Sequence, residues 1–164
     1  MYDVGVPRGM ADVRFRRITV AIDGSADGQA ALEVAIDLAK KYDAQLIVLT
    51  VAPIVAPYVP SAEPYVPAPL PNGEVTRYQA MVEAGVRLAE ASGVTAVTGL
   101  CEEGVVVDEI LAHVEHDAVD LLVVGSRGRS AARRILLGSV STAVVTHAPC
   151  AVVVVRPPAT PRSG

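Results

Sequence analysis

The sequence predicts an α/β domain built on a doubly wound, open parallel sheet of five strands with helices on both faces. Segments rich in Val, Ile and Leu alternate with segments of helical periodicity, and the strand segments are apolar on both faces. A chain of 164 residues, 51% of them hydrophobic and 20% charged, has the length of one domain and the material for one sizeable core.

Five short apolar segments carry the strand pattern. They are residues 17–23, 45–51, 95–101, 120–125 and 150–156. A continuous run such as Leu121 to Val124 has no polar face, which suits a strand covered by helices on both sides of a parallel sheet.

Four helical segments separate these strands, and Ser25 is the expected N-cap of the first. Their apolar faces are Ala31, Val34, Ala35, Leu38 and Tyr42 in the first, Val75, Tyr78, Val82, Val86 and Ala89 in the second, and Val107, Leu111 and Val114 in the third. The fourth begins at Gly138-Ser139 and must end near Pro149, because proline cannot continue the hydrogen-bond ladder. The element order is therefore βαβαβαβαβ.

One domain is expected over residues 16–156, with disordered tails at 1–15 and 157–164. Seven of the 12 prolines fall within residues 52–72. Because proline lacks an amide donor and resists helix, this segment is expected to be an extended loop facing solvent. A solvated variable loop is the favoured interpretation, and a lid or contact arm is the alternative.

Composition and charge argue against several function classes. A net charge of −4 gives no general attraction to nucleic acid or to an anionic membrane, and 4% aromatic residues leave few stacking surfaces for single strands. No apolar stretch is long and unbroken enough for a membrane span, and the N-terminus lacks the apolar run of a secretion signal. We expect a cytoplasmic protein that binds neither nucleic acid nor membrane.

The cysteines and histidines do not predict a metal site. Cys101 and Cys150 are too few for a disulfide scaffold and lack the paired spacing of a zinc site, so both are expected to be buried thiols. His113 and His116 have a helical spacing compatible with a metal but no assured third ligand, so both are expected at the surface. His147 is interpreted in the same way.

Two strand ends are the place to look for a ligand, because ligands of open parallel sheets bind beyond the carboxyl ends of the strands. Four of the last six arginines lie between Gly125 and Gly138, in a stretch of chain after Asp120 that has no acidic residue. Glycines there let the backbone approach a ligand closely, and a helix beginning at Gly138 presents unpaired amides to a phosphate. This pattern predicts a local anion site.

The spacing Gly125-x2-Gly128-x9-Gly138-Ser139 resembles the nucleotide-binding signature of the universal stress protein family, in its ATP-binding branch. The resemblance covers about residues 16–156 and includes an Asp at the end of the first strand. It implies a sheet of order 3-2-1-4-5 and a bound ATP, with Mg²⁺ arriving on the phosphates.

The resemblance also implies roles for individual residues. Ala21, Ile22 and Asp23 would lie by the adenosine, Val51 would line the base pocket, Val124 and Gly125 would flank the ribose, Arg127 and Gly128 would flank the mouth of the phosphate site, and Gly138, Ser139, Val140 and Ser141 would cradle the phosphates. Arg127 stands where many members of the family have His. Because Arg keeps a permanent charge, it favours a triphosphate over a nucleoside. Arg133 and Arg134 are expected to face solvent.

The implied strand order places residues 150–156 at an edge of the sheet. An exposed Ala-Val-Val-Val-Val edge invites pairing, and members of the family commonly dimerise there, so we expect a homodimer. In that order Cys101 and Cys150 lie four strand spacings apart, roughly 19 Å, which excludes an intrachain disulfide.

The resulting hypothesis is an ATP-binding sensor or switch of a stress response, with slow or no ATP hydrolysis and a protein partner that reads its state. A nucleotide-independent dimerising module and a binder of AMP or cAMP are the alternatives. A phosphohydrolase is disfavoured because no general base is evident, and Ser126 lacks the glycine two residues earlier that a hydrolase nucleophile elbow needs. The sequence has no P-loop and no dinucleotide-binding glycine spacing.

Overall fold

The computed structural model describes residues 14–54, 72–129 and 137–157, and its five strands form one parallel sheet of order β3-β2-β1-β4-β5. The elements are β1 (Arg17–Ala21), α1 (Ala26–Tyr42), β2 (Gln45–Pro53), α2 (Asn72–Ala91), β3 (Val97–Gly104), α3 (Val106–His116), β4 (Leu121–Gly125), α4 (Ser139–His147) and β5 (Ala151–Val155). The predicted fold class, element order and strand order are confirmed.

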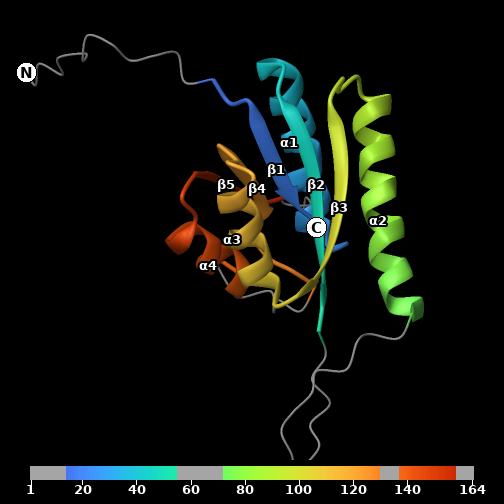
Figure 1. The fold of residues 1–164 in the computed structure, drawn as a ribbon. Coiled ribbons are helices and arrows are strands. Elements are labelled where there is room, and N and C mark those ends of the chain that lie inside the picture. The colour runs from blue at the N-terminus through green and yellow to red at the C-terminus, as the bar shows by residue number, and fades with distance from the viewer. Residues whose placement is uncertain (1–13, 55–71, 130–136, 158–164) are drawn as a thin grey trace, which may run out of the picture.

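The sheet is covered on both faces (Figure 1). Helices α1 and α2 pack on one face and α3 and α4 on the other, and each interface encloses its own hydrophobic core. The register aligns Val20 of β1 with Val48 of β2 and Val123 of β4, and all three side chains are completely buried in the core beneath α1 and α2. The central strands are buried on both faces, as predicted, and their buried polar residues are Thr19 and Thr50.

Helix α1 begins as the sequence indicates. The Ser25 hydroxyl oxygen accepts a hydrogen bond from the Gly28 amide at 3.0 Å, so Ser25 is the N-cap. The helix ends at Asp43, which adopts the left-handed conformation with φ 51°. The Ser25 cap fixes where the chain turns from β1 into α1, next to the carboxyl end of the sheet.

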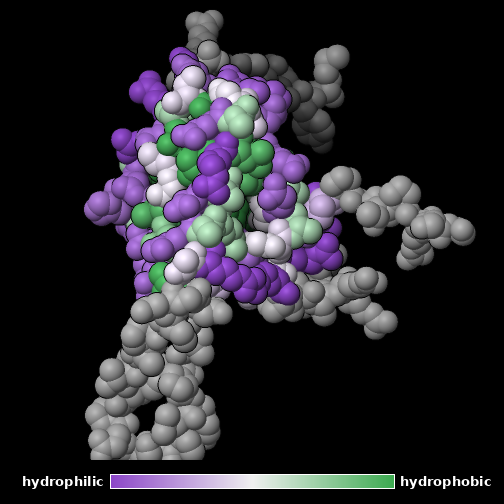
Figure 2. Space-filling view, turned by 90° about the vertical axis from the view of Figure 1, so that its right-hand side faces the viewer, coloured by the Kyte–Doolittle hydropathy of each residue, from purple (hydrophilic) through white to green (hydrophobic). Residues whose placement is uncertain are grey.

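Strand ends differ from the predicted ones by a few residues. β1 stops at Ala21, which leaves Ile22 and Asp23 in the turn before α1, whereas β2 extends to Pro53 and β3 spans 97–104 instead of 95–101. The expectation of two apolar faces is wrong for β3, because this strand lies at an edge and exposes Thr98 and Glu103. Figure 2 shows the molecule from the side of α2, where a strip of hydrophobic side chains lies between hydrophilic ones.

The expectation that His113 lies at the surface is wrong. His113 is only 7% exposed, and its Nε2 lies 3.1 Å from the hydroxyl of the fully buried Thr19 while its Nδ1 lies 2.7 Å from an Asp117 carboxylate oxygen. The hydrogen bond with His116 and the charge of nearby His113 hold the pKa of Asp117 below its usual value. Because α3 buries Ile110, His113 and Val114, its apolar stripe is also shifted from the predicted Val107, Leu111 and Val114.

Both cysteines are free and half-buried, so they are less enclosed than predicted. They lie at the two opposite edges of the sheet, and burial raises the pKa of both thiols. Phe15 packs edge-on against Tyr42 with ring centroids 5.1 Å apart, so the packed domain already includes a residue assigned to the N-terminal tail. Residues 1–13, most of the proline-rich loop (55–71) and the last residues (158–164) lie outside the described residues.

Candidate functional site

A cavity of about 630 Å³ opens beyond the carboxyl ends of β1, β2 and β4. Its lining includes every residue predicted for the site: Ala21, Ile22, Asp23, Val51, Val124, Gly125, Arg127, Gly128, Gly138, Ser139, Val140 and Ser141. The cavity also takes in Arg129, one of the four clustered arginines, and seven residues that the sequence did not indicate: Gly28, Leu49, Thr50, Pro53, Tyr78, Val106 and Ile110. Its place is where ligands of open parallel sheets bind, and its volume is that of a small-molecule site.

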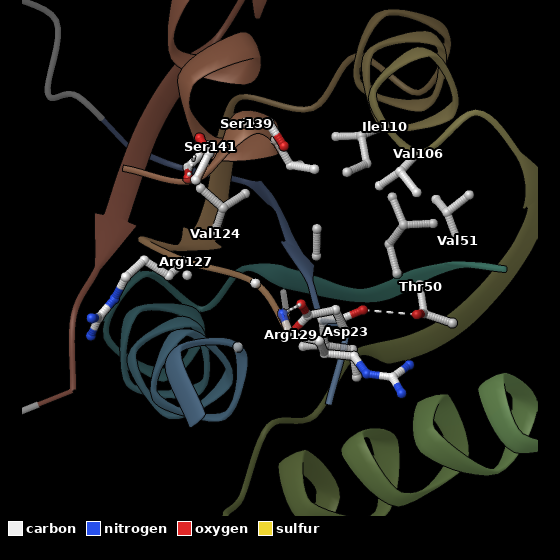
Figure 3. Close-up of a pocket in the computed structure, with 18 of the residues that line it drawn as sticks. Asp23, Thr50, Val51, Val106, Ile110, Val124, Arg127, Arg129, Ser139 and Ser141 are labelled. Carbon is white, nitrogen blue, oxygen red and sulfur yellow. Dashed lines mark hydrogen bonds between the residues drawn. The ribbon is translucent and has the colours of Figure 1, made fainter. Parts of the chain in front are cut away.

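One wall of the cavity is apolar. Val51 at the end of β2 faces Val106 and Ile110 of α3, as Figure 3 shows, and Leu49 and Val124 extend this wall to the sheet. Ile110 is 2% exposed and packs in the core on the α3 side of the sheet. Such a wall fits a flat, uncharged group such as a nucleotide base.

Asp23 lies at the bottom of the cavity and organises two turns. One carboxylate oxygen accepts the Ser25 amide at 2.9 Å and the other accepts the Arg129 amide at 3.1 Å. A Cβ at Gly128 would stand 2.9 Å from the same carboxylate, so glycine at 128 lets the second turn approach Asp23. A carboxylate has about four acceptor sites, so these two bonds leave capacity for a ligand hydroxyl or amino group.

The turn carrying Asp23 is itself fixed to β2. The Ile22 amide donates to the Leu49 carbonyl at 2.9 Å, and the Thr50 hydroxyl donates to the Ile22 carbonyl at 2.8 Å (Figure 3). Thr50 is 1% exposed. A hydroxyl in a strand of otherwise apolar residues was the only sequence signal for this support.

The polar wall begins at the N-terminus of α4. The N-cap residue is Gly138, which has no side chain that could bond to the first amides of the helix, and the first turn holds no acidic residue. The positive end of a helix dipole and its unpaired amides favour an anion, so this end of the cavity suits phosphate. Ser139 is exposed and lines the cavity, whereas the buried Ser141 hydroxyl donates to the Ser126 carbonyl at 2.8 Å.

Ser126 joins three elements beneath the cavity. Its amide donates to the Val155 carbonyl of β5 at 2.7 Å, its carbonyl accepts the Gly138 amide at 2.7 Å, and its hydroxyl donates to an Asp27 carboxylate oxygen of α1 at 2.6 Å. The residue is completely buried. An inaccessible hydroxyl bonded to a carboxylate in this way has a structural role.

Asp27 is the main site residue that the sequence did not reveal. Its carboxylate is nearly buried and also accepts the Arg127 amide at 3.1 Å and the Arg127 Nε at 3.3 Å. An acidic residue in the first turn of a helix is common for reasons of helix polarity alone, so nothing in the sequence singled it out. Its partners lie about a hundred residues further along the chain.

The glycines of the motif have different roles. A Cβ at Gly125 would lie 2.7 Å from the Asp27 carbonyl carbon and 2.8 Å from the Gly28 nitrogen, so glycine at 125 allows α1 to pack on β4. This packing accounts for glycine at 125 without reference to a ligand, although the residue also lines the cavity. At Gly138 a Cβ would meet nothing closer than 3.4 Å, so the fold does not require glycine there.

Three charged side chains line the cavity within the described part of the chain: Asp23, Arg127 and Arg129. No His or Cys side chain is among its lining residues, and nowhere in residues 14–54, 72–129 and 137–157 do three or more His, Cys, Asp or Glu side chains gather as a metal site. The Arg129 guanidinium approaches the Tyr78 hydroxyl at 3.5 Å on the side toward α2. Arg133 and Arg134 lie outside the described residues.

Among the described residues, no helix combines the length and the apolarity that crossing a bilayer requires.

Comparison with known proteins agrees with the fold and identifies the family. The sequence profile of the universal stress protein family matches residues 14–156. Universal stress protein YxiE of Bacillus subtilis is 35% identical over 148 residues, which cover 87% of this chain and 99% of that protein.

Two solved structures extend the comparison. Universal stress protein UspA of Lactobacillus plantarum superimposes with a TM-score of 0.78 at 27% identity, over 88% of this chain and all of that one. A universal stress protein solved in complex with cAMP superimposes with a TM-score of 0.64 at 26% identity, over 87% and 98% of the two chains. On the family match and the curated relative together, this chain belongs to the universal stress protein family.

Proposed function

We propose that this protein binds an adenine nucleotide in the cavity at the carboxyl ends of β1, β2 and β4 and acts as a nucleotide-dependent switch. The preferred ligand is ATP with Mg²⁺, and the bound state is read by a protein partner in a stress response. One observation carries the proposal: a single cavity joins an apolar wall, at Val51 and Ile110, to the open N-terminus of α4. A nucleotide has its groups in the matching order, with a flat base at one end, a ribose in the middle and anionic phosphates at the other end.

The ribose belongs between these two ends. Asp23 lies there with acceptor capacity to spare, and carboxylates are suitable acceptors for ribose hydroxyls or an adenine amino group. The complex of a family member with cAMP supports an adenine nucleotide as the ligand class. AMP and cAMP therefore remain the alternative ligands, and their affinities relative to that of ATP decide between them.

Binding without fast hydrolysis follows from what surrounds the phosphate end. The described lining residues include no histidine or cysteine, and the hydroxyls of Ser126 and Ser141 both donate hydrogen bonds within the protein. Because Asp23, the one carboxylate among the described lining residues, is assigned to the nucleoside, we expect ATP turnover below about 1 per second, the low end of ordinary enzymes. Mg²⁺ would be held by the phosphates rather than by protein carboxylates.

Calorimetric titration of the full chain with ATP, ADP, AMP and cAMP, each with and without Mg²⁺, tests the proposal. We expect saturable binding of one nucleotide per chain, with the highest affinity for ATP in the presence of Mg²⁺. Stronger binding of AMP or cAMP than of ATP would identify the alternative ligand. Failure of all four to bind would contradict the proposal and favour a nucleotide-independent interaction module.

We also propose that two copies of the chain pair through β5. The two edge strands of the sheet differ: β3 carries Glu102 and Glu103, whereas β5 is Ala-Val-Val-Val-Val with no charge. Charged side chains protect an edge from pairing, and an uncharged edge of β-branched residues favours it. The β5 valines are only half-buried in the single chain.

Light scattering should therefore give the mass of two chains, and Ala151→Lys should raise the dissociation constant of the dimer about tenfold or more, because it places a charge on each apposed edge. Ala151 is exposed, so the substitution leaves the core intact. Thr98→Lys, at an exposed position on the opposite edge strand, is the matched control and should leave the mass unchanged. Equal effects of the two variants would argue against pairing through β5.

A further inference from the structure

Asp27 is an unusual carboxylate for the edge of an anion site. The residue is 6% exposed, and the three hydrogen bonds that its side chain accepts from the described residues converge on one oxygen, Oδ2. Two of the donors belong to Arg127, whose amide lies at 3.1 Å and whose Nε lies at 3.3 Å from that oxygen. An enclosed carboxylate left without a partner costs much free energy, so the pair with Arg127 is part of the structure around the cavity.

The pair determines where the charge of Arg127 lies. Because Nε is bonded to Asp27, the guanidinium extends beside α1 and away from Ser139 and Ser141, as Figure 3 shows. The resemblance assigned Arg127 to the mouth of the phosphate site, and the residue does line the cavity there. Its charge, however, is already matched by that of Asp27.

Little other net charge remains at this end of the cavity within the described part of the chain. The charged residues of the lining are Asp23, Arg127 and Arg129, with Asp27 directly behind them. The formal charges of these two carboxylates and two guanidinium groups cancel, although only Asp27 and Arg127 form an ion pair. The grip on phosphate comes instead from the neutral amides of α4, which are available to a phosphate group whether the nucleotide carries one phosphate or three.

We propose that Asp27 is a specificity-determining residue of the nucleotide site: it withholds the charge of Arg127 from the phosphates and so limits the preference for polyphosphate over monophosphate nucleotides. This inference rests on the proposed function. A charge-assisted hydrogen bond from a guanidinium to a terminal phosphate discriminates between ATP and AMP, and the bond to Asp27 competes with it.

Asp27→Asn tests the proposal with little change of shape. Since all three bonds converge on Oδ2, the amide oxygen of asparagine can take that place and still accept the Ser126 hydroxyl and the Arg127 amide. Only the charge that holds the guanidinium is lost. Asp37→Asn removes the same charge from an exposed position on the same helix, where Asp37 pairs with Lys41, and is the matched control.

The measurement is the ratio of the affinities for ATP and AMP, determined by calorimetry in wild type, Asp27→Asn, Arg127→Gln and the double variant. We expect Asp27→Asn to raise this ratio about tenfold, the value of one charge-assisted hydrogen bond, and Asp37→Asn to leave it unchanged. Arg127→Gln should lower the ratio about tenfold when introduced with Asp27→Asn but only about twofold when introduced alone.

Equal effects of Arg127→Gln in both backgrounds would overturn the inference, because Asp27 would then act only through its charge and not by holding Arg127. The NMR signal of the Arg127 Nε–H in the nucleotide-free full chain gives a second test, since it should be protected from solvent exchange in wild type and lose that protection in Asp27→Asn. An unprotected wild-type signal would also overturn the inference. A wild type that binds no nucleotide would instead refute the proposed function, and this inference with it.

Discussion

Gly138→Val should lower the affinity for ATP by about thirtyfold or more while the protein stays folded. One contact between a phosphate and the end of a partly buried helix contributes up to about 2 kcal/mol, which corresponds to that factor. The valine side chain would stand at the entrance to the first turn of α4 and keep phosphates from its amides. Calorimetric titration of wild type and variant with ATP and Mg²⁺ measures the effect.

The backbone at Gly138 is compatible with a residue that has a Cβ. Gly138 has φ −71° and ψ 165°, a conformation that β-branched residues adopt readily, and a Cβ at this position would make only ordinary contacts with Arg127 and Ser141. The free energy of unfolding should stay within about 1 kcal/mol of wild type, as urea denaturation would show. Gly138→Ala adds one methyl group and should give an intermediate loss of affinity. Unchanged affinity in Gly138→Val would refute the phosphate site at α4.

Gly125→Ala should have the opposite profile, with a large loss of stability. Its Cβ would come within 2.7 Å of the Asp27 carbonyl carbon and 2.8 Å of the Gly28 nitrogen. Both atoms belong to the backbone of α1, which cannot rotate away as the end of a side chain can. The helix must shift from the sheet, and we expect the free energy of unfolding to fall by about 2 kcal/mol or more. Urea denaturation followed by circular dichroism measures it.

The two glycines thus serve as controls for each other. The same change to alanine at Gly138 should leave stability nearly unchanged, because the space there is open. If Gly125→Ala unfolds at the wild-type urea concentration, the close packing of α1 on β4 is not a determinant of stability. The prediction for Gly138 would stand regardless, since it concerns the affinity for nucleotide alone.

The sequence was sufficient for the parts of the site that depend on topology. Asp23, Gly125 and Gly138 each lie at an end of a strand or at the beginning of a helix, and in a parallel sheet such ends meet at one edge. The order of elements was enough to bring them together. The apolar runs likewise indicated the central strands, because a strand buried on both faces has no polar positions.

The sequence was insufficient where side chains from distant elements meet. Asp27 looks like an ordinary acidic residue of a first helical turn until α1 packs on Gly125 and brings it to Ser126 and Arg127. His113 looks like a surface residue because the rotation of α3 over the sheet, which places it against Thr19, is set by tertiary packing. The same rotation brings Val106 and Ile110 into the cavity.

Ser126 connects the proposed nucleotide site to the proposed dimer interface at β5. The Ser126 amide donates to the Val155 carbonyl of β5, and the Ser126 carbonyl accepts the Gly138 amide at the start of α4. One residue therefore connects the edge strand to the N-terminus of α4. If two chains pair through β5 as proposed, a shift of Val155 would reach the N-terminus of α4 through Ser126, and thermodynamic linkage requires pairing and nucleotide binding to affect each other equally. The apparent dissociation constant for the ligand should then vary with protein concentration.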